Sequence, residues 1–321
     1  MNVSYVEPLR LAWSRMTRML FRPIRVGFWF KLGFAAFLSE YLSWGIGRGR
    51  LGGHVRPDST PGVIPADVFG KIIDFLRNPF VTALVTWIAI CALAAYVLIT
   101  WISSRGRFIF LDNVAQERAA IVEPWRRFGR IGNSLFVWRL VFNTIVLMIV
   151  GVIAVPFLAA IAALIHADSF RLTDLLVLLP LPFMLLPVGI VAGYVHLCRI
   201  SFIEPIMYRD DSGVLAAWKR FLALFARRPL PFLIYGLYSL GLLIVAVAVV
   251  FAFGIGTLTI GFLLLATPYI GSVVLLPLEV TARALGPEFL AQFGSEYVAL
   301  GLPMAPVTPP AATPTSAPTP S

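Results

Sequence analysis

Apolar residues are arranged along this chain in long uninterrupted runs. Six of these runs could each cross about 30 Å of hydrocarbon, which requires roughly 20 helical residues. They lie near residues 26–46, 80–102, 138–165, 175–198, 231–253 and 257–282. The pattern therefore predicts an all-α integral membrane protein with six transmembrane helices.

Basic residues between these runs indicate the orientation of the helices. If the N-terminus is cytoplasmic, the cytoplasmic segments contain 18 Lys and Arg residues and the external segments contain 6. Cytoplasmic segments usually hold such an excess. Omitting the first span would place the Arg-rich segment 103–134 outside, so six spans are favoured over five. Both termini are predicted to be cytoplasmic.

Three cytoplasmic segments share a Glu-Pro pair followed by an amphipathic stretch with Trp and Arg. Proline suits the first turn of a helix, and basic amphipathic helices with Trp and Leu lie among lipid headgroups. The sequence thus predicts three interfacial helices, and a possible threefold repeat of an interfacial helix plus a transmembrane hairpin. Chance similarity between basic helices is the alternative. The pairs are Glu7-Pro8, Glu123-Pro124 and Glu204-Pro205; the expected apolar faces are Leu9, Trp13, Met16 and Leu20, then Trp125, Phe128 and Ile131, then Trp218, Phe221, Leu222 and Phe225.

Composition agrees with a membrane protein. Apolar residues make up 59% of the chain and charged residues only 13%, against about 25% charged residues in soluble domains. The net charge of +10 does not indicate nucleic acid, because most basic residues flank apolar runs, where they face anionic lipid headgroups. Residues 1–300 are expected to form a single membrane domain. The tail 301–321, rich in Pro, Thr and Ala, is expected to be disordered.

The chain lacks the usual motifs of catalysis or cofactor binding. Gly47, Gly49 and Gly52 match a dinucleotide fingerprint, but without the strand and helix that it needs. The histidines lie far apart in the sequence, and Cys91 and Cys198 fall within apolar runs without a metal-ligand spacing. We therefore expect no catalytic residue, no cofactor and no metal, and a protein that is not an enzyme.

Five charged residues are the candidates for polar contacts. Glu40 and Glu279 lie within predicted spans, where an ionisable residue suggests a functional site. The alternative is simple pairing with Arg48 and Arg283, or a shallow position at the membrane interface. Arg126, Arg127 and Arg130 form the basic face of the second amphipathic stretch and are candidates for lipid-headgroup contacts.

Several stretches resemble an uncharacterised family of bacterial multi-pass membrane proteins, which is similar to the membrane domain of glycerophosphoryl diester phosphodiesterases. The resemblance implies an integral membrane protein of the inner (plasma) membrane. The soluble phosphodiesterase domain is absent, so no hydrolase residue is transferred. The resemblance rests on Ser104–Phe108 with Phe110–Asp112, Pro124-Trp125 with Gly132–Phe136, Pro205–Tyr208 with Ala217-Trp218, and Phe289–Gly294 with Glu296-Tyr297.

These observations favour a non-enzymatic membrane scaffold or accessory protein that contacts anionic lipid or a membrane protein partner. The alternative is a small-solute transporter or channel, which the repeat, the prolines within the spans and Glu40 would suit. A lipid-modifying enzyme is a third hypothesis, for which the sequence offers no nucleophile and base.

Overall fold

The computed structural model describes residues 3–41, 78–166, 176, 179–257 and 260–300, and these residues form helices and no strand. The tail 301–321, and all but the last two residues of the predicted external segment 47–79, lie outside the described residues. The predictions for both are therefore untested.

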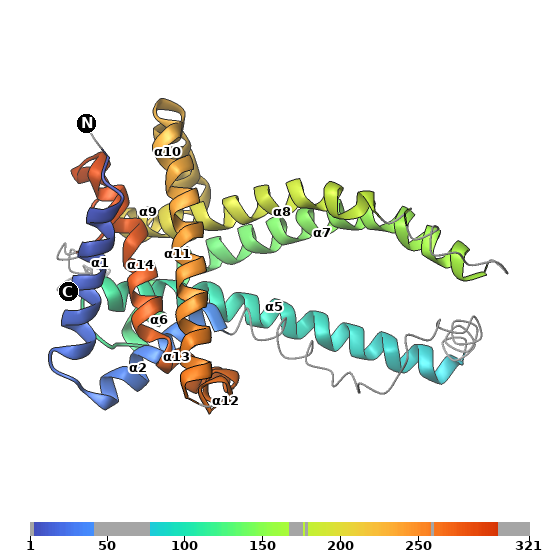
Figure 1. Ribbon diagram of the computed structural model, residues 1–321, viewed down its shortest axis with the longest axis horizontal. Coiled ribbons are helices and arrows are strands. Elements are labelled where there is room, and N and C mark those ends of the chain that lie inside the picture. Colours follow the sequence, from blue (N-terminus) through green and yellow to red (C-terminus); the bar gives the residue numbers. More distant parts are fainter. Residues whose placement is uncertain (1–2, 42–77, 167–175, 177–178, 258–259, 301–321) are drawn as a thin grey trace, which may run out of the picture.

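Four long apolar helices dominate the structure (Figure 1). Each contains an 18-residue window hydrophobic enough to cross a membrane. They are α5 (Pro79–Ala115), α7 (Gly129–His166), α11 (Pro229–Gly256), and the run from α8 (Pro180–Cys198) through the π-helix η3 (Arg199–Ile203) to α9 (Glu204–Asp210).

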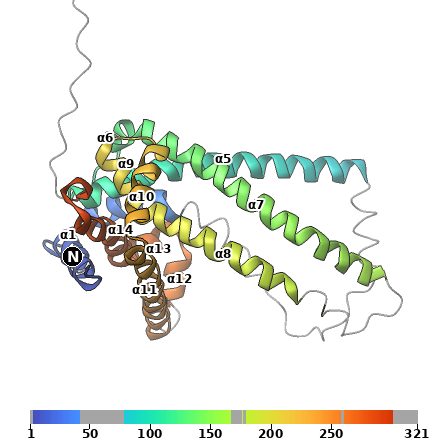
Figure 2. The same cartoon turned by 90° about the horizontal axis from the view of Figure 1, so that it is seen from above.

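The long helices diverge from a common base. Figure 2 shows that α5, α7 and α8 separate as they run away from it, while α11 leaves it in another direction. Their outer parts expose large apolar side chains, such as Val152 at 75% and Phe183 at 71%. Exposing this apolar surface to water would cost free energy, whereas contact with lipid hydrocarbon would not. The four helices define the chain as a membrane protein.

The first and sixth predicted spans do not form single long helices in the described residues. The first contains α2 (Val26–Ala36) and the π-helix η1 (Phe37–Tyr41), where the described part ends. The sixth is divided into α12 (Ile260–Ala266), α13 (Pro268–Val274) and α14 (Leu276–Leu290). Proline explains the first break: the residue before Pro268 takes an extended backbone, with ψ of 118°. Four spans are supported, and a count of six is not confirmed.

An aromatic core fills the base of the molecule. The rings of Tyr235 and Phe289 lie 4.5 Å apart, and Phe202 lies 5.0 Å from Tyr235 and 5.2 Å from Phe221. Phe232 stacks on Phe293 at 4.9 Å. Because these rings come from α10 (Val214–Arg227), α11, η3 and the C-terminal helices, they join distant parts of the chain.

The amphipathic helices bury only part of their expected apolar faces against this core. In α1 (Val6–Phe21), Ala12, Met16 and Leu20 are buried against the core, whereas Trp13 is 56% exposed. In α10, Phe221 is buried but Leu222 is 51% exposed. The second stretch is not one helix, because α6 (Val122–Arg127) ends before Phe128 and α7 begins at Gly129. Packing on neighbouring helices, rather than the sequence period alone, selects the buried stripe.

The three Glu-Pro pairs have neither equivalent places along their helices nor equivalent surroundings. Glu7-Pro8 and Glu123-Pro124 lie in the first turn of α1 and α6, as predicted, whereas Glu204-Pro205 lies within the continuous helical run from α8 to α9. The side chains of Glu7 and Glu123 are 48% and 61% exposed, whereas that of Glu204 is fully buried. This difference leaves the threefold repeat unconfirmed.

Candidate functional site

A carboxylate surrounded by three arginines lies at the base of the long helices. Glu204 Oε1 accepts hydrogen bonds from Arg107 Nη1 at 3.3 Å and from Arg199 Nη1. Its other oxygen, Oε2, accepts from Arg283 Nη1 at 2.5 Å. We call these four residues the Glu204 cluster.

Three separate regions of the chain meet in the Glu204 cluster. Arg107 belongs to α5, Arg199 and Glu204 to the α8–α9 run, and Arg283 to α14. Arg283 Nη2 also donates to the Arg107 carbonyl at 2.9 Å. The cluster therefore ties α5 to α14 directly as well as through the carboxylate.

Two glycines allow neighbouring helices at the base to approach closely. A Cβ added at Gly286 of α14 would lie 2.4 Å from the Ser201 carbonyl oxygen of η3. A Cβ at Gly106 of α5 would lie 2.7 Å from the Leu38 carbonyl carbon of η1. Because backbone atoms occupy both positions, glycine is needed at these two crossings.

All four side chains of the Glu204 cluster are at least 95% buried. Moving charges out of water costs several kcal/mol per ion, which is offset only by close pairing and further hydrogen bonds. Electrostatic attraction within the cluster therefore holds the three regions of the chain together.

A second buried carboxylate lies close by. Asp112 Oδ1 accepts from the Tyr208 hydroxyl at 3.0 Å, and Asp112 Oδ2 accepts from Arg118 Nη2 at 2.9 Å. Arg118 Nη1 also donates to Glu123 Oε2 at 2.9 Å. These bonds tie α5 to α9 and to the start of α6.

Arg139 forms a third polar contact near the base. It is 7% exposed, and its Nη1 donates to Ser104 Oγ at 2.9 Å and to Ser103 Oγ at 3.2 Å. Ser103 in turn donates to the Ser39 carbonyl at 2.8 Å. The arginine thus links α7 to α5, and Ser103 links α5 to η1.

The five charged residues taken as candidates from the sequence are not members of the Glu204 cluster. Glu279 lies in the first turn of α14 and is half-buried, but Arg283, its expected partner, bonds Glu204. The Glu40 side chain lies outside the described part of the structure. The three remaining candidates, Arg126, Arg127 and Arg130, lie around α6, and Arg130 pairs with Asp211 at 2.8 Å while 72% exposed.

Sequence reasoning did not identify the Glu204 cluster, because the apolar windows end where charged residues begin. The predicted span ended at residue 102, but α5 continues to Ala115 and brings Arg107 into the core. Likewise α8 continues past Cys198, through η3, to Asp210. One signal was present: Arg107 and Pro205 fall within the stretches that resemble other membrane proteins.

The histidines and cysteines provide no second site in the described residues. No group of three His, Cys, Asp or Glu side chains there could hold a metal ion. Cys198 is buried and Cys91 lies on the exposed surface of α5, and both are free thiols.

Helix α1 is fastened to the rest of the base by a smaller ionic contact. Arg18 donates to both carboxylate oxygens of Glu117, at 3.1 and 2.5 Å, and Arg15 donates to Glu117 at 3.3 Å and to Glu288 at 3.2 Å. The hydrogen bond from Arg18 holds the pKa of Glu117 below its ordinary value, although partial burial opposes the shift. Charged Glu117 is therefore the form that the docked α1 favours.

We expect α1 to loosen in acid. Because the pKa of Glu117 is lowered in the folded state, its contribution is complete above the ordinary carboxyl pKa and disappears as the pH falls through the lowered value. The effect should be below about 1 kcal/mol, since Arg18 is over half exposed. Hydrogen exchange of α1 amides, corrected for intrinsic rates, should increase in acid for the wild type. Glu117→Gln should show the faster exchange already at pH 7; a wild-type pH profile in this variant would contradict the assignment.

The helical base and its diverging apolar helices define a helical membrane protein, and comparison with known families gives its family. A family model described as a family of unknown function (DUF7544) matches residues 3–313. The chain therefore belongs to this uncharacterised family. No curated protein and no solved structure matches the chain.

Proposed function

We propose that this protein is a non-enzymatic membrane scaffold or accessory protein, which holds anionic lipid or a membrane protein partner. One observation carries the proposal. The apolar windows of the four long helices are at most 6% buried within the chain. Surfaces of this kind must be covered by something other than the chain itself.

The same observation disfavours a transport pathway within a single copy. A pathway needs polar groups enclosed by several spans. Between the outer parts of α5 and α7, one polar contact joins described residues, Asn143 Nδ2 to the Tyr96 hydroxyl at 2.9 Å. The other polar contacts between α5 and α7 lie at the base, where they fasten helices together.

The proposed arrangement in the membrane follows the charge distribution. Six spans with both termini in the cytoplasm would place the base on the cytoplasmic side of the inner membrane. The amphipathic helices α1, α6 and α10 would then lie at headgroup level. The resemblance to the membrane domain of glycerophosphoryl diester phosphodiesterases fits this placement and remains a hypothesis.

The basic surface around α6 suits anionic headgroups. Arg105 stacks over Trp101 at 4.5 Å and lies 5.5 Å from the Trp125 ring. Arg126 and Arg130 are exposed, and both lie close to Trp125 in the sequence. Tryptophan at the interface combined with exposed arginine is typical of membrane-surface helices.

Native mass spectrometry of the protein, extracted gently from its own membranes, tests the proposal. We expect retained anionic lipid or a stoichiometric protein partner. Each basic residue near an anionic surface contributes about 1 kcal/mol, so Arg126→Gln, Arg127→Gln and Arg130→Gln together should weaken retention roughly tenfold or more. Lys219→Gln on the exposed surface of α10 removes one charge at the same headgroup level and should weaken retention less than the triple change.

A bare monomer or homo-oligomer would contradict the scaffold proposal and favour the transporter. The next measurement would then be solute uptake into proteoliposomes that contain the Glu40→Gln variant. Loss of uptake would support transport, and wild-type uptake would exclude a role for the Glu40 carboxylate in it.

A further inference from the structure

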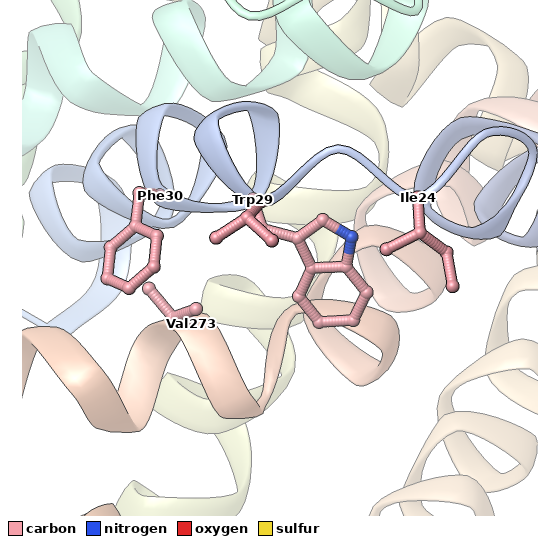
Figure 3. Close-up of a pocket in the computed structure, with 5 residues that line it drawn as sticks. Ile24, Trp29, Phe30 and Val273 are labelled. Carbon is pink, nitrogen blue, oxygen red and sulfur yellow. The ribbon is translucent and has the colours of Figure 1, made fainter.

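An apolar groove lies at the connection between α1 and α2. It has a volume of about 180 Å³ and is lined by Ile24, Val26, Trp29, Phe30 and Val273. Figure 3 shows the labelled side chains, with Ile24, Trp29 and Phe30 from one segment and Val273 from α13 opposite. The lining contains no charged residue.

Neighbouring contacts hold the walls of this groove in place. Trp29 Nε1 donates to the Leu20 carbonyl at 2.9 Å, and the Trp29 ring meets the edge of Phe21 at 5.6 Å. On the opposite wall, the Tyr269 hydroxyl donates to the Phe30 carbonyl at 2.8 Å, which ties α13 to α2. The groove is therefore part of the packed structure and does not depend on a mobile side chain.

Three exposed basic residues, which we call the rim, neighbour the lining residues in the sequence. Arg22 and Arg25 precede α2, Arg25 stands between two lining residues in sequence, and Lys31 follows one turn later. All three are exposed, and within the described residues none of them forms an ion pair. Basic side chains without acidic neighbours, next to an apolar groove, match the charge of an anionic headgroup.

The place of the groove fits the level of lipid headgroups. Helix α2 begins the short apolar stretch Val26–Ser39, and α1 before it is amphipathic. Lys31 lies about 8 Å along α2 from Val26, at about 1.5 Å per residue, and can reach back to the interface with its long side chain. An apolar cavity of about 150 Å³ accommodates benzene, so the groove has room for a short stretch of acyl chain.

We propose that this groove binds one anionic glycerophospholipid, with its phosphate on Arg22 and Arg25 and an acyl chain between α2 and α13. The proposal deepens the scaffold function and rests on it, since it names the lipid class and the site. Zwitterionic lipid would lack the net negative charge that the rim matches. A second copy of the chain would bring its own excess of basic residues to a basic rim.

Brominated lipids provide a direct test, because bromine in an acyl chain quenches a tryptophan that it contacts. The full-length protein is reconstituted into phosphatidylcholine vesicles with a small fraction of acyl-brominated phosphatidylglycerol or acyl-brominated phosphatidylcholine. The signal of Trp29 is the difference between the wild type and Trp29→Phe. We expect phosphatidylglycerol to quench this signal roughly tenfold more effectively at equal mole fraction.

Matched charge variants identify the headgroup contacts. Arg22→Gln with Arg25→Gln should abolish the preference for phosphatidylglycerol. Arg10→Gln with Lys219→Gln removes the same charge from exposed sites elsewhere and should keep the preference. If Trp29→Phe does not fold, native mass spectrometry of the two charge variants answers the same question, as the first should retain one phosphatidylglycerol fewer.

Equal quenching by the two lipids would overturn the proposal, as would the absence of quenching, which would mean that protein covers the groove. The scaffold proposal fails on a different result, namely that neither lipid nor partner is retained from native membranes. The two failures are therefore distinguishable.

Discussion

The Glu204→Gln variant is expected to lose about 3–5 kcal/mol of its free energy of unfolding. Glutamine has nearly the volume of glutamate, so packing changes little. The loss arises because Arg107, Arg199 and Arg283 would keep their charges inside the protein without the carboxylate that all three contact. Unfolding in detergent micelles, followed by tryptophan fluorescence, measures the change.

The chain contains its own control for this substitution. Glu7→Gln makes the same chemical change in another Glu-Pro pair, which lies in the first turn of α1. Its partner is Arg10, and the two side chains are 48% and 76% exposed. We expect a loss below about 1 kcal/mol there. Equal losses in the two variants would show that the Glu204 cluster does not hold the helices together.

The Gly286→Ala variant is expected to be destabilised by about 1–3 kcal/mol, the usual cost of overpacking a core. Its new methyl group would lie 2.4 Å from the carbonyl oxygen and 2.6 Å from the Cα of Ser201. Both are backbone atoms of η3, so relief requires α14 to move away from the α8–α9 run. That movement would also lengthen the bond between Arg283 and Glu204.

Gly189→Ala in α8 is the matched control, because nothing lies within 4 Å of a Cβ added there. Alanine favours helices over glycine by up to about 1 kcal/mol, so this variant should be neutral or slightly more stable. Thermal unfolding of both variants in the same detergent measures the difference. A Gly286→Ala variant as stable as the wild type would mean that α14 and η3 do not cross as closely as described.

Several predictions from the sequence are confirmed by particular elements. Four long apolar helices lie where runs of apolar residues predicted spans, and the Glu7-Pro8 and Glu123-Pro124 pairs each begin a helix. Both signals are local: hydrophobic length and the position of proline depend on neighbouring residues alone. The family of unknown function is also consistent with the uncharacterised membrane family expected from resemblance.

Helix boundaries and faces were predicted less well. The α5 helix continues 13 residues beyond the predicted end at 102, and the sixth run is divided at Thr267 and Leu275. A charged residue ends a hydropathy window, but it does not end a helix when distant partners bury and neutralise it. Trp13 was expected on the apolar face of α1 with Met16 and Leu20. Those two residues are buried in the protein together with Ala12, whereas Trp13 is 56% exposed.

The sequence by itself determined that this chain belongs in a membrane, which segments are apolar enough to cross it and where basic residues gather. These properties follow from composition and from residues near one another in the chain. Only the tertiary structure decided that Arg107, Arg199, Glu204 and Arg283 meet, up to 176 residues apart, and that Ile24 and Val273 line one groove. The reason is that contacts between distant segments depend on how the helices cross. A glycine such as Gly286 allows a close crossing, but its neighbour at that crossing is known only from the fold.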